Sequence, residues 1–154
     1  MRILVISDSH GNTRNIERAV ESQPEANIII HLGDGADDIV DLEFVYRDKQ
    51  FYQVAGNCDW GSSLPLEGEL KVADKTIFFV HGHEYKVKTN LQQIKMEAKK
   101  RNADIVLFGH THLPITEYDD ELYLLNPGSL QNADGTYGII DITDAGVSVQ
   151  IIKV

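Results

Sequence analysis

Five short apolar runs divide the first two thirds of the chain, and polar residues follow each of them directly. The runs are rich in β-branched and aromatic side chains and only four or five residues long, which is typical of buried β-strands. They are Ile3–Ile6, Ile28–Leu32, Phe51–Ala55, Ile77–Val80 and Ile105–Phe108. The pattern therefore predicts five buried strands separated by longer connections.

Three segments between these runs have helical spacing. Asn12 or Thr13 can cap a first helix, which ends before Pro24. A second helix is expected from Ala36 to about Arg47 and a third from about Asn90 to Arg101. The apolar positions are Ile16, Ala19 and Val20 in the first, Ile39, Val40, Phe44 and Val45 in the second, and Leu91, Ile94 and Ala98 in the third.

The C-terminal third changes character and predicts a mostly antiparallel sheet. Its expected strands are Ile115–Tyr118, Leu122–Leu125, Tyr137–Ile142 and Val147–Ile152, with turns at Asp119-Asp120, Ala133-Asp134-Gly135 and Asp144-Ala145-Gly146. Helices early and hairpins late favour a sandwich of two sheets over a doubly wound sheet. With 154 residues and no linker or repeat, residues 1–154 are expected to form one domain.

Side chains that bind metal ions follow all five apolar runs. They are Asp8, His10, Asp34, Asn57, His81, His110 and His112. Ligand sites in α/β sheets lie beyond the carboxyl ends of strands, so these residues can meet in one place. Imidazoles mixed with oxygen donors suit first-row divalent ions, and seven donors are too many for one tetrahedral centre. We expect two divalent ions, with Mn²⁺ the first candidate ahead of Ni²⁺, Fe²⁺, Zn²⁺ and Mg²⁺.

Spacing does not divide these donors between the two ions. Asp34 stands alone in the sequence and is the better candidate for a bridge through its two oxygens. Asp8 and His10 alternate with one residue between them, as do His110 and His112, so in extended backbone each pair points to one side. Such a pair can chelate one ion or contact both.

The polar motifs resemble those of a known family. They are Asp8-Ser9-His10-Gly11-Asn12, Gly33-Asp34, Gly56-Asn57-Cys58-Asp59, His81-Gly82-His83, Gly109-His110-Thr111-His112 and, further on, Asn126-Pro127-Gly128-Ser129. In this order they resemble the calcineurin-like metallophosphoesterases, and most of all their small YfcE-like branch of bacterial and archaeal phosphodiesterases. The resemblance implies an α/β (α+β) fold, a metallophosphoesterase-type αββα sandwich of two packed mixed sheets flanked by helices. It also implies one ion on Asp8, His10 and His112, another on Asn57, His81 and His110, and Asp34 between them.

The expected activity is hydrolysis of a small phosphodiester by a hydroxide that bridges the two ions. No protein side chain is expected to be catalytic beyond this metal-bound hydroxide. Larger members of the superfamily have a histidine where this chain has Cys58, so we expect leaving-group quality to matter. One alternative is a phosphomonoesterase or nucleotidase on the same site. Another is a non-catalytic protein-binding scaffold of the retromer-subunit kind, which the complete ligand set disfavours.

Several residues near the motifs have two interpretations. His83, Cys58, Gly11 and Asn12 are candidates to support the ligands or contact substrate, and the backbone N–H of Gly11 can face a phosphate oxygen. A thiol nucleophile at Cys58 is disfavoured beside a metal-activated water. The remaining expectations are a buried hydrogen-bonded His31, a solvated helix face for Asp37, Asp38, Asp41 and Glu43, and either cleft lining or packing for Trp60.

Composition narrows the class of partner. The net charge of −10, from 24 acidic and 14 basic residues, makes long DNA or RNA a poor partner. A small phosphate ester is the expected partner, and a homo-oligomer stays open. One cysteine excludes an internal disulfide, and neither an apolar span of membrane length nor a signal peptide is evident. A cytoplasmic location away from membranes is therefore expected.

Overall fold

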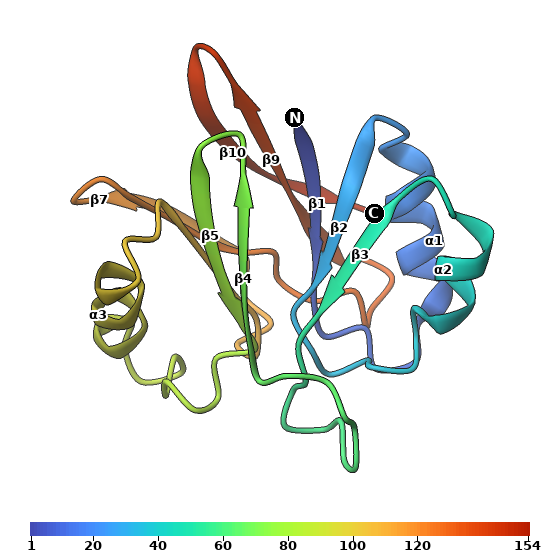
Figure 1. Cartoon of the computed structure of the whole chain (residues 1–154). Helices are drawn as coiled ribbons and strands as arrows, with labels where there is room; N and C mark the ends of the chain where they lie inside the picture. The colour runs from blue at the N-terminus through green and yellow to red at the C-terminus, as the bar shows by residue number, and fades with distance from the viewer.

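The computed structural model describes residues 1–154 and contains two five-stranded sheets with three helices (Figure 1). The first sheet has the strand order β10-β9-β1-β2-β3 and the second the order β4-β5-β6-β8-β7. In chain order the elements are β1 (Arg2–Ile6), α1 (Thr13–Ser22), β2 (Ala26–His31), α2 (Val40–Val45), β3 (Gln50–Gln53), β4 (Glu67–Val72), β5 (Lys75–Val80), α3 (Gln92–Lys100), β6 (Ile105–Phe108), β7 (Ile115–Asp119), β8 (Leu122–Asn126), β9 (Thr136–Thr143) and β10 (Gly146–Lys153).

Buried apolar residues form three layers, one between the two sheets and one on the outer side of each sheet. The central layer joins the facing sides of the two sheets and includes Val5, Ile30, Phe79 and Leu107. A second layer packs α1 and α2 on the outer side of the first sheet, and a third packs α3 on the outer side of the second. The sandwich of two mixed sheets flanked by helices is therefore confirmed.

Parallel pairing brings the ends of the strands to one rim. β1, β2 and β3 are parallel to one another in the first sheet, as are β5, β6 and β8 in the second. The loops that follow β1, β2, β3 and β5 gather along the lower edge of the molecule in Figure 1. Polar residues that directly follow strands of both sheets thus face each other across this rim.

The second helix is shorter than the apolar spacing predicted. It covers only Val40–Val45, and Val40, Phe44 and Val45 are exposed while Ile39 and Leu42 are buried. Residues 36 to 39 form turns because Asp38 is bonded into the loop after β1 instead of lying on a helix face. The first and third helices agree with the prediction to within two residues at either end.

Strand β4 was missed because its sequence does not look like a buried strand. Charged residues alternate along Glu67–Val72, and the strand pairs only with β5 at the edge of the second sheet. The predicted hairpins of the C-terminal third are present as β7–β8 and β9–β10. None of the three helices has the length and hydropathy needed to cross a membrane.

Candidate metal centre

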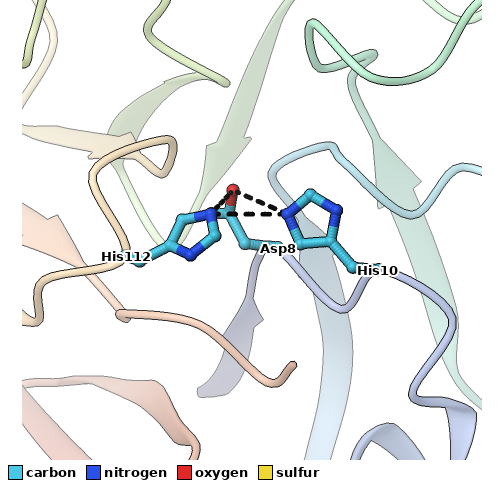
Figure 2. A group of neighbouring side chains, drawn as sticks. All are labelled: Asp8, His10 and His112. Atoms are coloured by element: carbon cyan, nitrogen blue, oxygen red, sulfur yellow. Dashed lines mark hydrogen bonds and ion pairs between the residues drawn. The ribbon is translucent and has the colours of Figure 1, made fainter. Parts of the chain in front are cut away.

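Asp8, His10 and His112 form the first cluster of donors (Figure 2). Asp8 and His10 follow β1 of the first sheet, and His112 follows β6 of the second. His112 Nε2 lies 3.0 Å from Asp8 Oδ1 and 3.4 Å from His10 Nε2, and His10 Nε2 lies 3.9 Å from Asp8 Oδ1. Three ligand atoms from two sheets therefore point at one another.

Asp8 has one satisfied oxygen and one without a partner. Its Oδ2 accepts hydrogen bonds from Ser7 Oγ at 2.5 Å and from the His110 N–H at 3.0 Å. Its Oδ1 is buried and accepts no hydrogen bond, although His112 Nε2 lies 3.0 Å away. A buried carboxylate oxygen without a partner is costly unless a cation or proton compensates it. The free oxygen beside two imidazoles fits a divalent ion.

Asp34, Asn57, His81 and His110 form the second cluster. His81 Nε2 lies 3.1 Å from Asn57 Oδ1, 3.1 Å from His110 Nδ1 and 3.5 Å from Asp34 Oδ2. His81 Nδ1 is 2.8 Å from the carbonyl oxygen of Leu32, and a carbonyl only accepts, so Nδ1 carries the proton. The lone pair of His81 is therefore on Nε2, which faces the other donors.

Asp34 lies between the two clusters through a single oxygen. Its Oδ2 is 3.8 Å from His10 Nε2 in the first cluster and 3.5 Å from His81 Nε2 in the second. Its Oδ1 accepts a hydrogen bond from the Cys58 N–H at 2.7 Å. Oδ2 therefore lies within 4 Å of a donor in each cluster, and the bridge through two oxygens stays a prediction.

The backbone at these donors is not extended. Positive φ angles occur at Asp8 (52°), His10 (45°), Asp34 (57°), His110 (66°) and His112 (59°). Non-glycine residues adopt this left-handed region rarely and at a cost, and such residues concentrate at functional sites. The expectation that simple strand alternation aligns each pair was wrong. Tight left-handed turns bring the side chains together instead.

Asp59 organises the loop of Asp34, a role that the sequence did not reveal. Its Oδ2 accepts hydrogen bonds from the N–H groups of Asp34 and Gly56, and its Oδ1 from those of Gly35 and Ala36, all at 2.7–2.9 Å. Burial alone would raise the pKa of Asp59, but these four N–H groups lower it. The ionised carboxylate therefore holds the loops after β2 and β3 together.

His31 supports the loop after β1 from inside the first sheet. The Gly33 N–H donates to His31 Nδ1, so Nε2 carries the proton and donates to Ser9 Oγ at 3.0 Å. Ser9 Oγ in turn donates to Asp38. Burial is the largest cause that lowers the pKa of His31, to about 4. The expectation of a buried, hydrogen-bonded His31 is confirmed.

Two expectations near this network were wrong. The Gly11 N–H donates to Asp38 Oδ2 at 2.8 Å and is not free for a phosphate oxygen. Asp38 is half-buried and outside α2, so it does not belong to a solvated helix face. Asn12 caps α1 by accepting a hydrogen bond from the Asn15 N–H, and it donates to the carbonyl of Gln131.

Cys58 and His83 border the clusters, and Trp60 follows Cys58 in the loop after β3. Cys58 is exposed, and Asn57 Nδ2 donates to its Sγ at 3.3 Å. Reduced solvation and the Asp34 carboxylate raise the pKa of the Cys58 thiol. His83 lies with its ring 5.5 Å from that of His81, and its buried Nδ1 has no partner. Trp60 is 88% exposed, so the packing alternative was wrong.

The later motif at residues 126–129 braces the loop after β6. Asn126 Nδ2 donates to the Gly109 carbonyl at 2.8 Å and to Thr111 Oγ1 at 3.0 Å. Ser129 Oγ donates to the carbonyl of Asp8 at 2.8 Å.

Burial first, and then the nearby charges of His81 and Lys88, lower the pKa of His110 to about 4. Its imidazole is therefore neutral at pH 7, as metal ligation requires.

Comparison with known proteins identifies the class. Residues 1–145 match the model of the calcineurin-like phosphoesterase superfamily domain, so the chain belongs to this family. A phosphodiesterase of Methanocaldococcus jannaschii is 28% identical over 144 residues, which is 83% of each chain. A Streptococcus pneumoniae crystal structure described as a predicted phosphoesterase superposes with a TM-score of 0.85 at 25% identity, covering 99% of this chain and 88% of that one.

The same fold also occurs in a protein that is not named as a phosphoesterase. Wild-type Vps29 from Entamoeba histolytica, crystallised as a complex with zinc, has a TM-score of 0.74 and covers 99% of both chains. At 19% identity this likeness shows the fold alone. The family implies divalent metals, and the two clusters are candidate sites for them.

Proposed function

We propose that this metallophosphoesterase hydrolyses a small phosphodiester with two divalent metal ions, Mn²⁺ being the first candidate. The observation that carries the proposal is the pair of donor clusters that share Asp34 Oδ2. The unpartnered Asp8 Oδ1 in the first cluster supports a cation there.

Each cluster of donors would hold one of the two ions. Asp8, His10 and His112 would hold one ion, Asn57, His81 and His110 the other, and Asp34 would contact both. When bound, two divalent ions would ionise a water molecule for attack on phosphorus and offset charge on the phosphoryl oxygens. The chain's own contribution is to hold seven donors at fixed positions, through the proton on His81 Nδ1 and the N–H bonds of Asp59.

A diester fits the electrostatics of the site better than a monoester. A diester carries one negative charge and a monoester close to two at neutral pH. No lysine or arginine bonds any of the seven donors, and the chain has a net charge of −10. The name of the archaeal relative, a phosphodiesterase, supports the same preference. A phosphomonoesterase or nucleotidase would use the same donors.

A protein-binding scaffold on this fold is the competing function. A Vps29 protein of this fold was crystallised with zinc, and bound metal by itself does not establish turnover. Turnover does separate them. The proposal therefore depends on a hydrolysis measurement, with metal content as a second readout.

The test starts from protein stripped of metal by a chelator. Mn²⁺, Ni²⁺, Zn²⁺ or Mg²⁺ is returned, metal per chain is counted by elemental analysis, and hydrolysis of bis(p-nitrophenyl) phosphate and p-nitrophenyl phosphate is measured. We expect two ions per chain and faster hydrolysis of the diester. Faster hydrolysis of the monoester would replace the diester proposal, and metal binding without any turnover would favour the scaffold.

The identity of Cys58 adds a second part to this test. Without a side chain placed to protonate the leaving oxygen, the rate should depend steeply on leaving-group pKa, and aryl esters should exceed alkyl esters. Cys58→His, which introduces the side chain of the larger relatives, should raise turnover most for alkyl leaving groups. A rate independent of leaving-group pKa would indicate a proton donor already in place, with the partnerless His83 the first residue to replace.

A further inference from the structure

A groove with mainly apolar walls lies directly beside the candidate metal centre. It has a volume of about 390 Å³, within the range of small-molecule sites. Its apolar walls are Val87, Leu91, Phe108, Leu113 and Ile115, and Lys88 and Thr111 complete the lining. The groove belongs to the second sheet, where the loop after β5, the start of α3 and the strand β7 approach one another.

The chain connects this groove to the donors without a gap. Thr111 lies between His110 and His112, and Leu113 follows His112 directly. Thr111 Oγ1 accepts hydrogen bonds from Asn126 Nδ2 at 3.0 Å and from the Leu113 N–H at 3.2 Å. These bonds fix the segment that carries both histidines and one wall of the groove.

The walls are formed in advance and remain open to solvent. Val87 and Phe108 are buried, at 5% and 1% exposure, and form the floor. Leu113 is 70% exposed and Ile115 is 38% exposed at the rim. Lys95 of α3 forms ion pairs with Glu117 and Asp119 of β7, which hold the helix beside the strand (Figure 1). Covering this exposed apolar surface with an apolar group removes it from water, which favours binding.

The one charged residue of the groove is Lys88. Lys88 forms no ion pair, although the chain has ten more acidic than basic residues. It lines the groove together with Thr111, which lies between the candidate ligands His110 and His112. An anionic group at the donors and an apolar group in the groove would satisfy both features.

We infer that the groove binds an apolar, aromatic arm of the phosphodiester whose phosphate group lies at the metal centre. This inference rests on the proposed function and names the class of its substrate. The occupant is part of the substrate and not another protein, because the groove is continuous with the donors through Thr111 and Leu113 and its lining includes the unpaired cation Lys88. The groove thus sets specificity through the arm that is attached to phosphorus.

Substrates with one constant leaving group test this inference. The Mn²⁺-loaded protein is given methyl, phenyl and 1-naphthyl diesters of p-nitrophenyl phosphate, so that p-nitrophenolate leaves in each reaction. We expect kcat/KM to rise about 10- to 100-fold from the methyl to the naphthyl ester, mainly through KM, because apolar groups of this size discriminate by about that factor. Equal kcat/KM for the three esters would overturn the inference and leave the proposed function intact.

Two variants assign the preference to the groove. Leu113→Ser and Ile115→Thr should each reduce the naphthyl-to-methyl ratio of kcat/KM several-fold. Leu113 is next to the candidate ligand His112 in the sequence, whereas Ile115 is next to none. Val45→Ser is a matched control because Val45 lies on α2 and is 69% exposed, close to the 70% of Leu113. The control should keep the ratio of the unchanged protein. A ratio that is unchanged in Leu113→Ser and Ile115→Thr would place the apolar arm elsewhere.

A binding measurement covers the case in which no ester is hydrolysed. 1-Naphthylmethylphosphonate and methylphosphonate carry no ester bond, and their affinities for the Mn²⁺-loaded protein are compared by calorimetry. We expect the naphthyl compound to bind at least about tenfold more tightly, and this advantage to fall in Leu113→Ser. Equal affinities, or a change of oligomeric state in Leu113→Ser, would overturn the inference, the second result by showing that another copy of the chain covers the groove.

Discussion

The two sheets contribute different chemistry to the rim where they meet. The first-sheet edge, formed by the loops after β1, β2 and β3, supplies two carboxylates, an amide and one imidazole. The second-sheet edge, formed by the loops after β5 and β6, supplies the other three imidazoles. Each donor cluster takes members from both edges. Bound ions would therefore join the two sheets, and neither edge has a complete set of ligands.

The edges also differ in how their donors are supported. On the first-sheet edge the negative charge of the carboxylates is balanced by hydrogen bonds, including the Cys58 N–H on Asp34 and Ser7 Oγ on Asp8. On the second-sheet edge the Nδ1–H of His81 donates to a single carbonyl oxygen, that of Leu32. The comparison indicates that removing the charge of Asp34 on the first edge should affect both ions, whereas loss of an imidazole on the second should affect one.

The largest effect is expected for Asp34→Asn, which removes the charge that both clusters share. Changes to residues that only orient metal ligands cost about 10- to 100-fold, so loss of this donor should lower turnover by more than about 100-fold. Both ions should be lost together in elemental analysis after gel filtration. Full activity with one ion per chain would show that Asp34 does not contact both.

Smaller and selective losses are expected for single members of each cluster. His112→Ala should remove mainly the ion of the first cluster, and Asn57→Ala should weaken mainly that of the second. Two-step metal titration calorimetry should then show one binding event lost or weakened and the other kept, with turnover reduced less than in Asp34→Asn. An equal fall of both events in either variant would contradict the division of donors.

A still smaller effect is expected for Asp59→Asn, which leaves every ligand in place. An amide nitrogen would face two of the four N–H groups that Asp59 now accepts, and the loops after β2 and β3 should loosen. We expect metal affinity to fall about tenfold and thermal stability to fall with it. Asp37→Asn is the matched control, since Asp37 is exposed in the loop after β2, which Asp59 bonds, and no hydrogen bond or ion pair involves its carboxylate. Equal affinities in the two variants would remove the positioning role of Asp59.

Much of this arrangement can be predicted from the sequence, for reasons that differ between the sheets. Buried strands such as Ile3–Ile6 are predictable because β-branched residues face apolar layers on both sides. The edge strand β4 is not, because its charged residues alternate toward solvent. The predicted length of α2 was wrong for a related reason. Spacing indicated an apolar helix face, but Asp38 bonds Ser9 and Gly11 of the loop after β1, which keeps it out of the helix.

The candidate site likewise has features that the sequence predicts and features that it does not. The seven donors could be found because each follows an apolar run. Their geometry could not, since it depends on left-handed turns at residues such as Asp8 and His110. The role of Asp59 depends on four backbone N–H groups from two loops, and no pattern in the sequence marks such contacts.

The smallest effect is expected for Cys58→Ser, on the first-sheet edge. Its backbone N–H bonds Asp34 Oδ1, and serine keeps that bond. The raised pKa of the thiol leaves it protonated at pH 7, which disfavours a thiolate nucleophile. We therefore expect both ions to stay bound and turnover to change by no more than about two- to threefold, as for an exposed position of little energetic weight. Loss of turnover with both ions still bound would make the thiol a catalytic group, and a phosphoryl group trapped on sulfur, detected by mass spectrometry, would establish a covalent mechanism in place of direct attack by water.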